Sequence, residues 1–187
     1  MPDNEKKIYL TFDDGPTPNV TDVLLDVLKN YDAKATFFCL GKNVLENNSL
    51  FDRIRKEGHQ IGNHTWDHLN GKMVRTSDYI TSISKTQEII ISKLFRPPYG
   101  RIRKEQVNLI SNQFKIIMWS VLSRDFDLKQ SKEKCLSTVL KHTKDGSIIV
   151  FHDSLKASSQ MLYAVPKILE YYQEKGFEFS AINEGLI

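Results

Sequence analysis

Short apolar runs alternate with stretches of helical spacing along the chain. Runs rich in β-branched and aromatic side chains predict strands at residues 7–12, 35–40, 60–63, 114–121, 147–151 and 177–181. Between them, apolar residues three or four positions apart predict helices at residues 20–31, within 43–57, and at 77–92, 104–112, 131–143 and 164–175. This order indicates an α/β fold of about seven strand–helix units.

The predicted strands are continuously apolar instead of alternating, which is typical of a parallel sheet covered by helices. An open doubly wound sheet and a barrel both fit this pattern, and both place their chemistry at the carboxyl ends of the strands. Polar or rigid residues lie at the ends of successive elements, at Asp13-Asp14, Asn63-His64, Arg96 to Tyr99, Arg124-Asp125 and His152-Asp153. We therefore expect them to meet at one rim of the sheet.

Composition is that of an ordinary globular protein. The 187 residues are 40% hydrophobic and 26% charged, which argues against disorder and predicts one domain over residues 1–187. The net charge of +3 arises from interspersed residues, 26 basic and 23 acidic, and gives no footprint for nucleic acid or a membrane surface. We expect the basic cluster Arg101, Arg103 and Lys104 to be a solvated face.

Two further features bear on the cellular compartment. Cys39 and Cys135 are the only cysteines, and two well-separated thiols do not indicate a disulfide framework. Residues 1–5 lack the basic and apolar regions of a signal peptide, and no later run approaches about 20 apolar residues. The chain is thus expected to be cytoplasmic, or secreted or attached to the cell envelope if a leader has been removed.

Two adjacent carboxylates end the first predicted strand. Asp13 and Asp14 are followed by Gly15 and Pro16, which stop regular structure. Side chains alternate in direction along a strand, so the two carboxylates can do different work, one binding a cation and the other handling protons. By itself an Asp-Asp-Gly sequence is more typical of a solvated turn.

His64 and His68 lie four residues apart, a spacing at which two imidazoles on a helical turn face the same way. Alone the spacing is more often incidental. Together with Asp14 they make a three-ligand set for a catalytic Zn²⁺ that leaves a fourth position for water or substrate. Such a metal lowers the pKa of bound water from about 15.7 to near 7.

Acid–base roles follow for three further residues. Asp13 is free to act as general base, and Arg96 is its natural partner, because a guanidinium matches a carboxylate and keeps it ionised. The alternative for Arg96 is a surface ion pair. The backbone N–H of Tyr99, after two prolines, is a candidate donor to an oxyanion.

His152 follows the most apolar strand and is a candidate proton donor to a leaving group. Asp125 is a candidate to orient and charge-stabilise it. The alternative is a buried structural histidine, the role expected of His59 and His142.

Five motifs in one order resemble the polysaccharide deacetylase family, also called carbohydrate esterase family 4 or the chitooligosaccharide deacetylase homology domain. The resemblance extends from about residue 7 to residue 181. The motifs are Thr11-Phe12-Asp13-Asp14-Gly15, His64-Thr65-Trp66-Asp67-His68, Arg96-Pro97-Pro98-Tyr99, Asp125-Phe126 and Val150-Phe151-His152-Asp153. This resemblance implies a distorted, incomplete α/β barrel and metal-dependent removal of acetyl groups from N- or O-acetylated sugars.

Carried over by position, the family pattern makes Asp13 the base and His152 the acid. It implies Asp14, His64 and His68 as ligands of a divalent metal, with Zn²⁺ first and Co²⁺, Ni²⁺ or Mn²⁺ as alternatives. Arg96 would tether the base, Asp125 would support the acid and the Tyr99 amide would help the oxyanion. The expected partner is an acetylated glycan, above all one containing N-acetylglucosamine, and the chain is expected to act as a monomer.

Three positions depart from the family pattern. Phe126 stands where the family usually has Trp, Val150 where it has Leu, and Leu122 where it often has an additional Asp. The substrate pocket is expected to include Pro97, Tyr99, Phe126 and Val150. Alternative functions are an O-acetyl esterase acting on xylan, a non-sugar amidohydrolase, and a carbohydrate-binding domain without catalysis.

Overall fold

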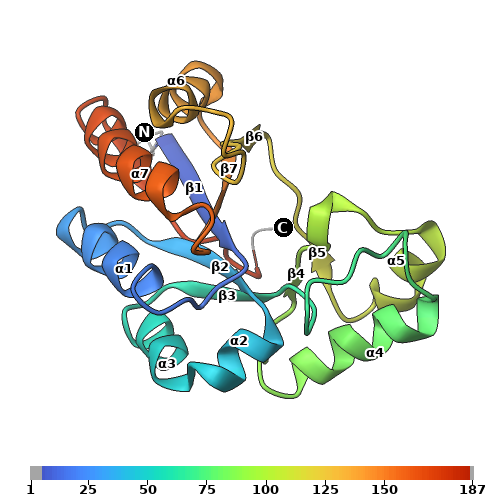
Figure 1. The fold of residues 1–187 in the computed structure, drawn as a ribbon. Helices are drawn as coiled ribbons and strands as arrows, with labels where there is room; N and C mark the ends of the chain where they lie inside the picture. The colour runs from blue at the N-terminus through green and yellow to red at the C-terminus, as the bar shows by residue number, and fades with distance from the viewer. Residues whose placement is uncertain (1–5, 186–187) are drawn as a thin grey trace.

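Parallel strands curl into an incomplete barrel in the computed structural model, which describes residues 6–185 (Figure 1). The expectation drawn from residues 1–5 lies outside this part. Along the sheet the strands are β5 (Lys115–Ile116), β4 (Leu94–Phe95), β3 (Gln60–Asn63), β2 (Ala35–Cys39), β1 (Lys6–Asp13), β7 (Ile148–His152) and β6 (Val121–Leu122). An eighth strand, β8 (Phe177–Phe179), pairs with the beginning of β1.

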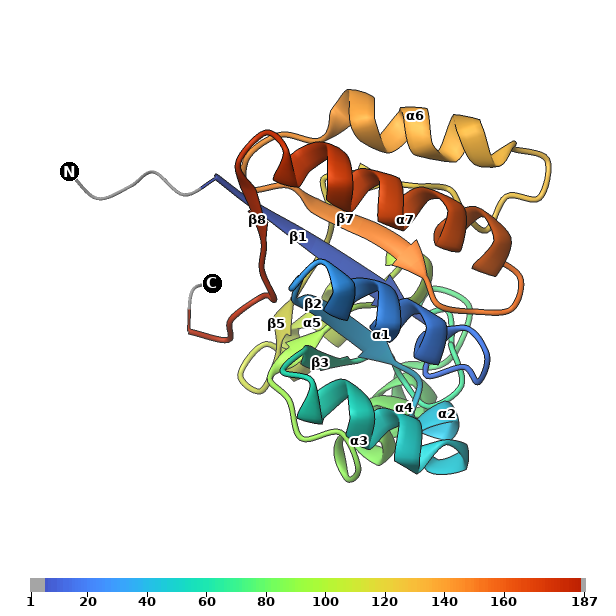
Figure 2. The ribbon, with the colours of Figure 1, turned by 90° about the vertical axis from the view of Figure 1, so that its left-hand side faces the viewer.

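Seven helices occur within the described residues, and several pack along the outside of the sheet (Figure 2). They are α1 (Thr21–Asn30), α2 (Gly41–Glu46), α3 (Asn48–Lys56), α4 (Thr76–Gln87), α5 (Lys104–Ile110), α6 (Lys132–His142) and α7 (Ser158–Gln173). A short 3₁₀ turn, η1 (Pro98–Gly100), follows β4. No described helix is both long enough and apolar enough to cross a membrane.

The side chains of the central strand β1 alternate between the two faces of the sheet. Its Ile8, Leu10 and Phe12 are fully buried in the main core, which also holds the apolar faces of α1 and α7. Side chains alternate along a strand, so Thr11 and Asp13 point to the inner face. The sequence therefore builds the core and delivers a carboxylate to the barrel interior with the same eight residues.

The apolar run 114–121, predicted as one strand, instead forms two short strands on opposite edges of the sheet. β5 pairs with β4, β6 pairs with β7, and no β5–β6 ladder closes the barrel in the described chain. The intervening Ile117 is buried in an inner cluster with Phe38 and Leu94. The prediction of one strand was wrong because the buried segment that connects β5 to β6 needs the same apolar residues as a buried strand.

Three helix boundaries also differ from prediction. The helix expected within residues 43–57 is interrupted at Asn47, whose φ of −131° and ψ of 47° are not helical. The helix expected to reach residue 92 ends at Gln87. The last helix begins at Ser158, not at residue 164, and includes Pro166. Buried Met161 and Ala164 continue its apolar face, so packing there outweighs the cost of a proline, about 3 kcal/mol.

Candidate active site

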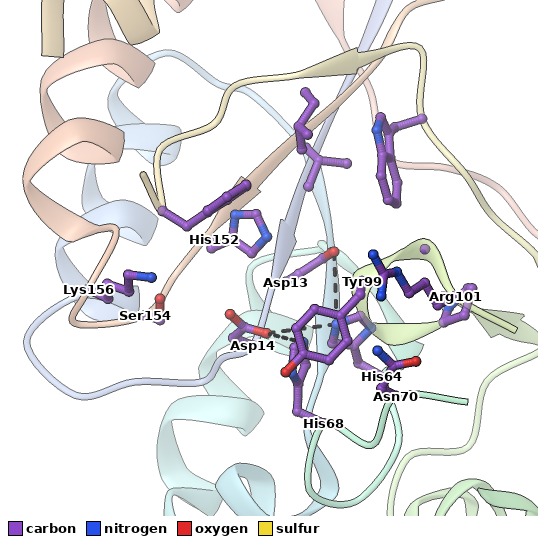
Figure 3. A pocket seen from close by; sticks show the side chains of 16 residues that line it. Asp13, Asp14, His64, His68, Asn70, Tyr99, Arg101, His152, Ser154 and Lys156 are labelled. Carbon is purple, nitrogen blue, oxygen red and sulfur yellow. Dashed lines mark ion pairs between the residues drawn. The ribbon is translucent and has the colours of Figure 1, made fainter. Parts of the chain in front are cut away.

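The carboxyl ends of four strands bring ionisable residues to one cavity. Asp13 ends β1, His64 follows β3, Pro97 follows β4 and His152 ends β7, and all line a cavity of about 610 Å³. Figure 3 shows the side chains of Asp13, His64 and His152 converging, with Asp13 and Asp14 between the histidines. The convergence expected at one rim of a parallel sheet is present.

Asp14, His64 and His68 form a group of metal-ligand type. One donor atom of each lies within 4.8 Å of the others. Asp14 Oδ1 is 3.2 Å from His68 Nε2 and 3.8 Å from His64 Nε2. This oxygen is buried and has no hydrogen-bond partner among the described residues. A buried acceptor without a partner, facing two imidazoles, fits the place of a cation, because leaving it unsatisfied is costly.

The two histidines converge without a helical turn, contrary to the geometry expected from their spacing. Thr65 and His68 have φ angles of 68° and 62°, in the left-handed region. Asn63 Oδ1 accepts the Thr65 N–H at 2.9 Å, and the Ser82 hydroxyl accepts the Trp66 N–H at 2.9 Å. The irregular segment is thus held by side chains of β3 and α4.

His64 has a defined orientation. Its Nδ1 lies 2.7 Å from the Arg96 carbonyl oxygen, which can only accept a hydrogen bond. Nδ1 therefore carries the proton, and Nε2 presents its lone pair toward Asp14. Burial lowers the pKa of His64, which favours the neutral imidazole that a metal needs.

Arg96 is fully buried and pairs with Asp13, so it is no surface ion pair. Its Nη1 donates to Asp13 Oδ1 at 2.8 Å and to Thr11 Oγ1 at 2.6 Å, and its Nε donates to the Ile117 carbonyl at 3.1 Å. Burial alone would raise the pKa of Asp13, but the charges of Arg96, His64 and His152 bring it below its ordinary value. Asp13 is therefore held ionised at the edge of the cavity.

His152 is bound by Asp125 at two points. Asp125 Oδ1 lies 2.8 Å from His152 Nδ1, and Oδ2 accepts the backbone N–H of His152 at 2.7 Å. Burial opposes the charge, yet the hydrogen bond and charge of Asp125 raise the pKa of His152 to about 9. The Phe126 ring packs edge-on at 5.2 Å between centroids. This arrangement makes His152 a cation whose Nε2 is the nitrogen left for a ligand.

Tyr99 lies at the mouth of the cavity. Its φ of 59° places the backbone in the left-handed region, and its side chain is 61% exposed. The ring packs against His68 at 4.5 Å between centroids. No described residue accepts a hydrogen bond from its backbone N–H, which leaves that donor for a ligand.

The remaining predicted pocket residues, Pro97, Phe126 and Val150, line the cavity, as does Leu122. Six further lining residues were not predicted: Asn70, Gly100, Arg101, Trp119, Ser154 and Lys156. All of them except Trp119 lie within four residues after a residue already assigned to the site, and that position was the signal that could have found them. Arg101 is exposed, as expected of a solvated face, and it also lines the cavity.

Other expectations for individual side chains are confirmed in some cases and wrong in others. Arg103 donates to the carbonyls of Gly71 and Val74, which ties it to the protein and makes it more than a solvated charge. His59 is buried as expected and accepts the Ala35 N–H at 3.2 Å, whereas His142 is exposed. Cys39 and Cys135 are free, buried thiols.

Asp153, which had no role in the sequence-based scheme, secures the turn that follows Asp14. It is fully buried, its Oδ1 accepts the Gly15 N–H at 2.9 Å and its Oδ2 accepts the Thr21 hydroxyl at 2.6 Å. A Cβ at Gly15 would collide with this carboxylate. Burial raises the pKa of Asp153 to about 7. The turn that carries Asp14 is thereby fixed to the end of β7.

Comparisons with known proteins agree with this geometry. Residues 1–116 match the family model described as polysaccharide deacetylase. Peptidoglycan-N-acetylglucosamine deacetylase PgdA of Listeria monocytogenes is 37% identical over 185 residues, which cover 96% of this chain and 38% of PgdA. The chain thus spans about two fifths of that relative.

Two other relatives are matched over most of their length. A peptidoglycan-N-acetylglucosamine deacetylase of Bacillus cereus is 36% identical over 193 residues, covering 100% of this chain and 91% of the relative. The solved structure of peptidoglycan deacetylase PdaC from Bacillus subtilis superposes with a TM-score of 0.87 at 32% identity, covering 96% of this chain and 89% of that one. This chain belongs to the polysaccharide deacetylase family, carbohydrate esterase family 4.

Proposed function

We propose that this chain is a metal-dependent deacetylase that hydrolyses N-acetyl groups of an N-acetylglucosamine-containing glycan and releases acetate. The observation that carries the proposal is the placement of an ionised Asp13 and a protonated His152 in one cavity with the Asp14, His64 and His68 group. Names of the relatives support a glycan of the peptidoglycan type as the first substrate to test.

Asp14, His64 and His68 would hold the metal, through Asp14 Oδ1 and two imidazole nitrogens. A divalent cation bound there supplies Lewis acidity, which lowers the pKa of water and polarises the acetyl carbonyl. Zn²⁺ suits two nitrogen ligands and one carboxylate best, and Co²⁺, Ni²⁺ and Mn²⁺ are the alternatives.

Asp13 is assigned the role of general base. Arg96 keeps it ionised and aims it, so that it accepts a proton from the water that adds to the acetyl carbon. The Tyr99 N–H, which no described residue occupies, is assigned to the oxygen of the tetrahedral intermediate.

His152 is assigned the role of general acid. Asp125 occupies Nδ1, so the proton leaves from Nε2 to the amide nitrogen of the sugar as the carbon–nitrogen bond breaks. A pKa of about 9 keeps the imidazole charged at neutral pH. The products are acetate and a free amino sugar.

Acetate release tests the proposal. Purified protein is incubated with N-acetylglucosamine oligomers and with peptidoglycan, before and after chelation, and then with Zn²⁺ restored. We expect acetate that disappears with the chelator and returns with the metal. Failure to release metal-dependent acetate from any acetylated glycan would contradict the deacetylase assignment.

Parallel substrates separate the alternatives. Acetylated xylan tests ester hydrolysis, and simple non-sugar acetamides test a general amidase. A catalytically inactive binding domain would bind these glycans without acetate release. The assigned base, acid and ligands all being present in one cavity argues for catalysis.

A further inference from the structure

Two basic side chains enter the cavity from opposite sides. Figure 3 shows Arg101 on one side and Lys156 on the other, with Asp13, Asp14 and His152 between them. Arg101 follows η1, and Lys156 lies in the segment between β7 and α7. Both are exposed at the cavity mouth.

The fold fixes the backbone at both positions. The Arg101 N–H donates to the Pro98 carbonyl at 3.0 Å, and its own carbonyl lies where a Cβ on Gly71 would come within 2.8 Å. On the other side, the Ala157 N–H closes a turn on the Ser154 carbonyl at 3.1 Å. The two cations are thus carried by ordered turns, and their side chains alone need to settle on a ligand.

The acidic side chains of the cavity contact other residues than these two cations. Asp13 is paired with Arg96 at 2.8 Å, and Asp14 faces the two histidines. Neither Arg101 nor Lys156 forms an ion pair with any acidic group in the described part of the chain. The cavity mouth therefore carries two positive side chains without an ion-pair partner in the described chain, although the whole chain has a net charge of only +3.

We propose that Arg101 and Lys156 form two anion subsites that bind carboxylate groups on an acidic acetylated glycan, on either side of the sugar that reacts. A guanidinium binds a carboxylate with two parallel hydrogen bonds, and an ammonium binds it as a point charge. Asn70 and Ser154 also line the cavity and offer neutral hydrogen-bonding groups. The glycan nature of the ligand rests on the proposed function, whereas the preference for negative charge rests on these two side chains.

Carboxylates reach such a glycan by two routes. They are borne by the sugar itself, as in a lactyl ether or a uronic acid, or by a peptide attached to it. Both have the same chemistry at Arg101 and Lys156. A neutral glycan such as chitin has neither and leaves both cations without a partner.

Equilibrium binding tests the subsites in full-length Asp13→Asn protein, where the assigned base is removed so that the probe is not consumed. Four labelled tetrasaccharides serve as probes. The first contains only neutral N-acetylglucosamine, and the second alternates N-acetylglucosamine with N-acetylmuramic acid. The third is the methyl ester of the second, and the fourth is the second with stem peptides attached. We expect an acidic probe to bind at least about tenfold more tightly than the neutral and esterified ones. Tight binding of the bare acidic sugar places the carboxylate on the sugar, and a preference seen only with stem peptides places it on the peptide.

The double variant Arg101→Gln/Lys156→Gln is expected to lose that preference while binding the neutral probe within about twofold. Arg55→Gln/Lys134→Gln is the matched control, because both residues are exposed on α3 and α6, lie outside the cavity and remove the same two charges. The control is expected to keep the preference. Equal affinity for all four probes, or equal losses in the two double variants, overturns the subsites.

Acetate release by protein with Asp13 intact separates this inference from the proposed function. Charge-dependent binding without acetate release from any glycan would support the anion subsites and contradict the proposed deacetylase function. Acetate release at equal kcat/KM from neutral and acidic glycans, unchanged in Arg101→Gln/Lys156→Gln, removes the subsites and leaves the deacetylase.

Discussion

Asp125 binds His152 with both carboxylate oxygens, one 2.8 Å from the ring Nδ1 and the other 2.7 Å from the backbone nitrogen. The two contacts fix the ring and its tautomer together. They also explain how an imidazole that is largely shielded from water keeps a pKa of about 9. Removing the charge of Asp125 should therefore change the pH range in which His152 is protonated, as well as the orientation of its ring.

Asp125→Asn is expected to move the basic limb of the pH dependence of kcat/KM. The acid must be protonated, so activity falls as pH rises through about 9, and without the Asp125 charge this fall should shift toward the ordinary histidine pKa of about 6.5. Asp127→Asn is the control, because that carboxylate pairs with Arg124 instead. An unshifted basic limb in Asp125→Asn would exclude His152 as the titrating acid.

Asp13 and Asp14 are expected to differ in what their loss removes. Asp13→Asn should retain bound metal and lose about 10²–10⁴-fold in kcat, the usual worth of a general base. Asp14→Asn should lose metal affinity by more than about 100-fold, because loss of outer-shell contacts alone costs about 10–100-fold. Zinc content after dialysis, measured by mass spectrometry, separates them. Equal metal loss in both variants would refute the division of roles.

Arg96→Ala should unfold the protein more easily by about 3–5 kcal/mol, because it leaves the buried Asp13 charge without its partner. Arg53→Ala is the matched comparison. Arg53 pairs with Asp26 and Glu57 but is partly exposed, and its loss should cost about 0–1 kcal/mol. Urea unfolding at neutral pH measures both. Similar costs for the two variants would mean that the Arg96 pair contributes no more than a surface one.

His59 should make stability depend on pH below neutrality. Burial, with help from the charge of Lys34, lowers the pKa of His59 from 6.5 to about 4. The unfolded chain then binds the proton more readily, so the stabilisation present above pH 6.5 is lost as pH falls toward 4, by up to about 3 kcal/mol.

The matched variants for that effect are His59→Gln and His142→Gln. Unfolding free energies measured from pH 4.5 to 7.5 should depend less steeply on pH in His59→Gln. The exposed His142 should behave as wild type when replaced by Gln. Parallel curves for all three proteins would exclude His59 as the source.

Sequence reasoning brought the candidate site residues to one cavity because parallel strands gather their carboxyl ends. Asp13 and Arg96 are 83 residues apart, and both were expected at the same rim, although the strand that precedes Arg96, β4, was not predicted. The same logic brought His152 to the site. Local chain direction was harder: the spacing of His64 and His68 suggested a helical turn, whereas left-handed residues and side chains of neighbouring elements bring them together.

The features that the sequence did not predict are those for which two arrangements suit the same apolar or charged residues equally well. Only the tertiary structure selects between them. Residues 114–121 are apolar enough for one strand, but Ile117 is needed inside the open part of the barrel, and the run divides. Arg101 and Arg103 are alike in sequence, and only the turn at η1 sends Arg101 into the cavity. Asp153 looks like a second loop carboxylate until Gly15 and Thr21 are seen beside it.

Position 96 contacts two side chains of the candidate site through different parts of one residue. Its guanidinium restrains Asp13, while its carbonyl oxygen selects the tautomer of His64. Every side-chain substitution keeps the carbonyl, so a complete mutational scan of this position would report only the first effect. Substitutions at this position are therefore expected to disturb the proposed base while His64 keeps the tautomer of a metal ligand, so that turnover and metal affinity would be separately adjustable at a single codon.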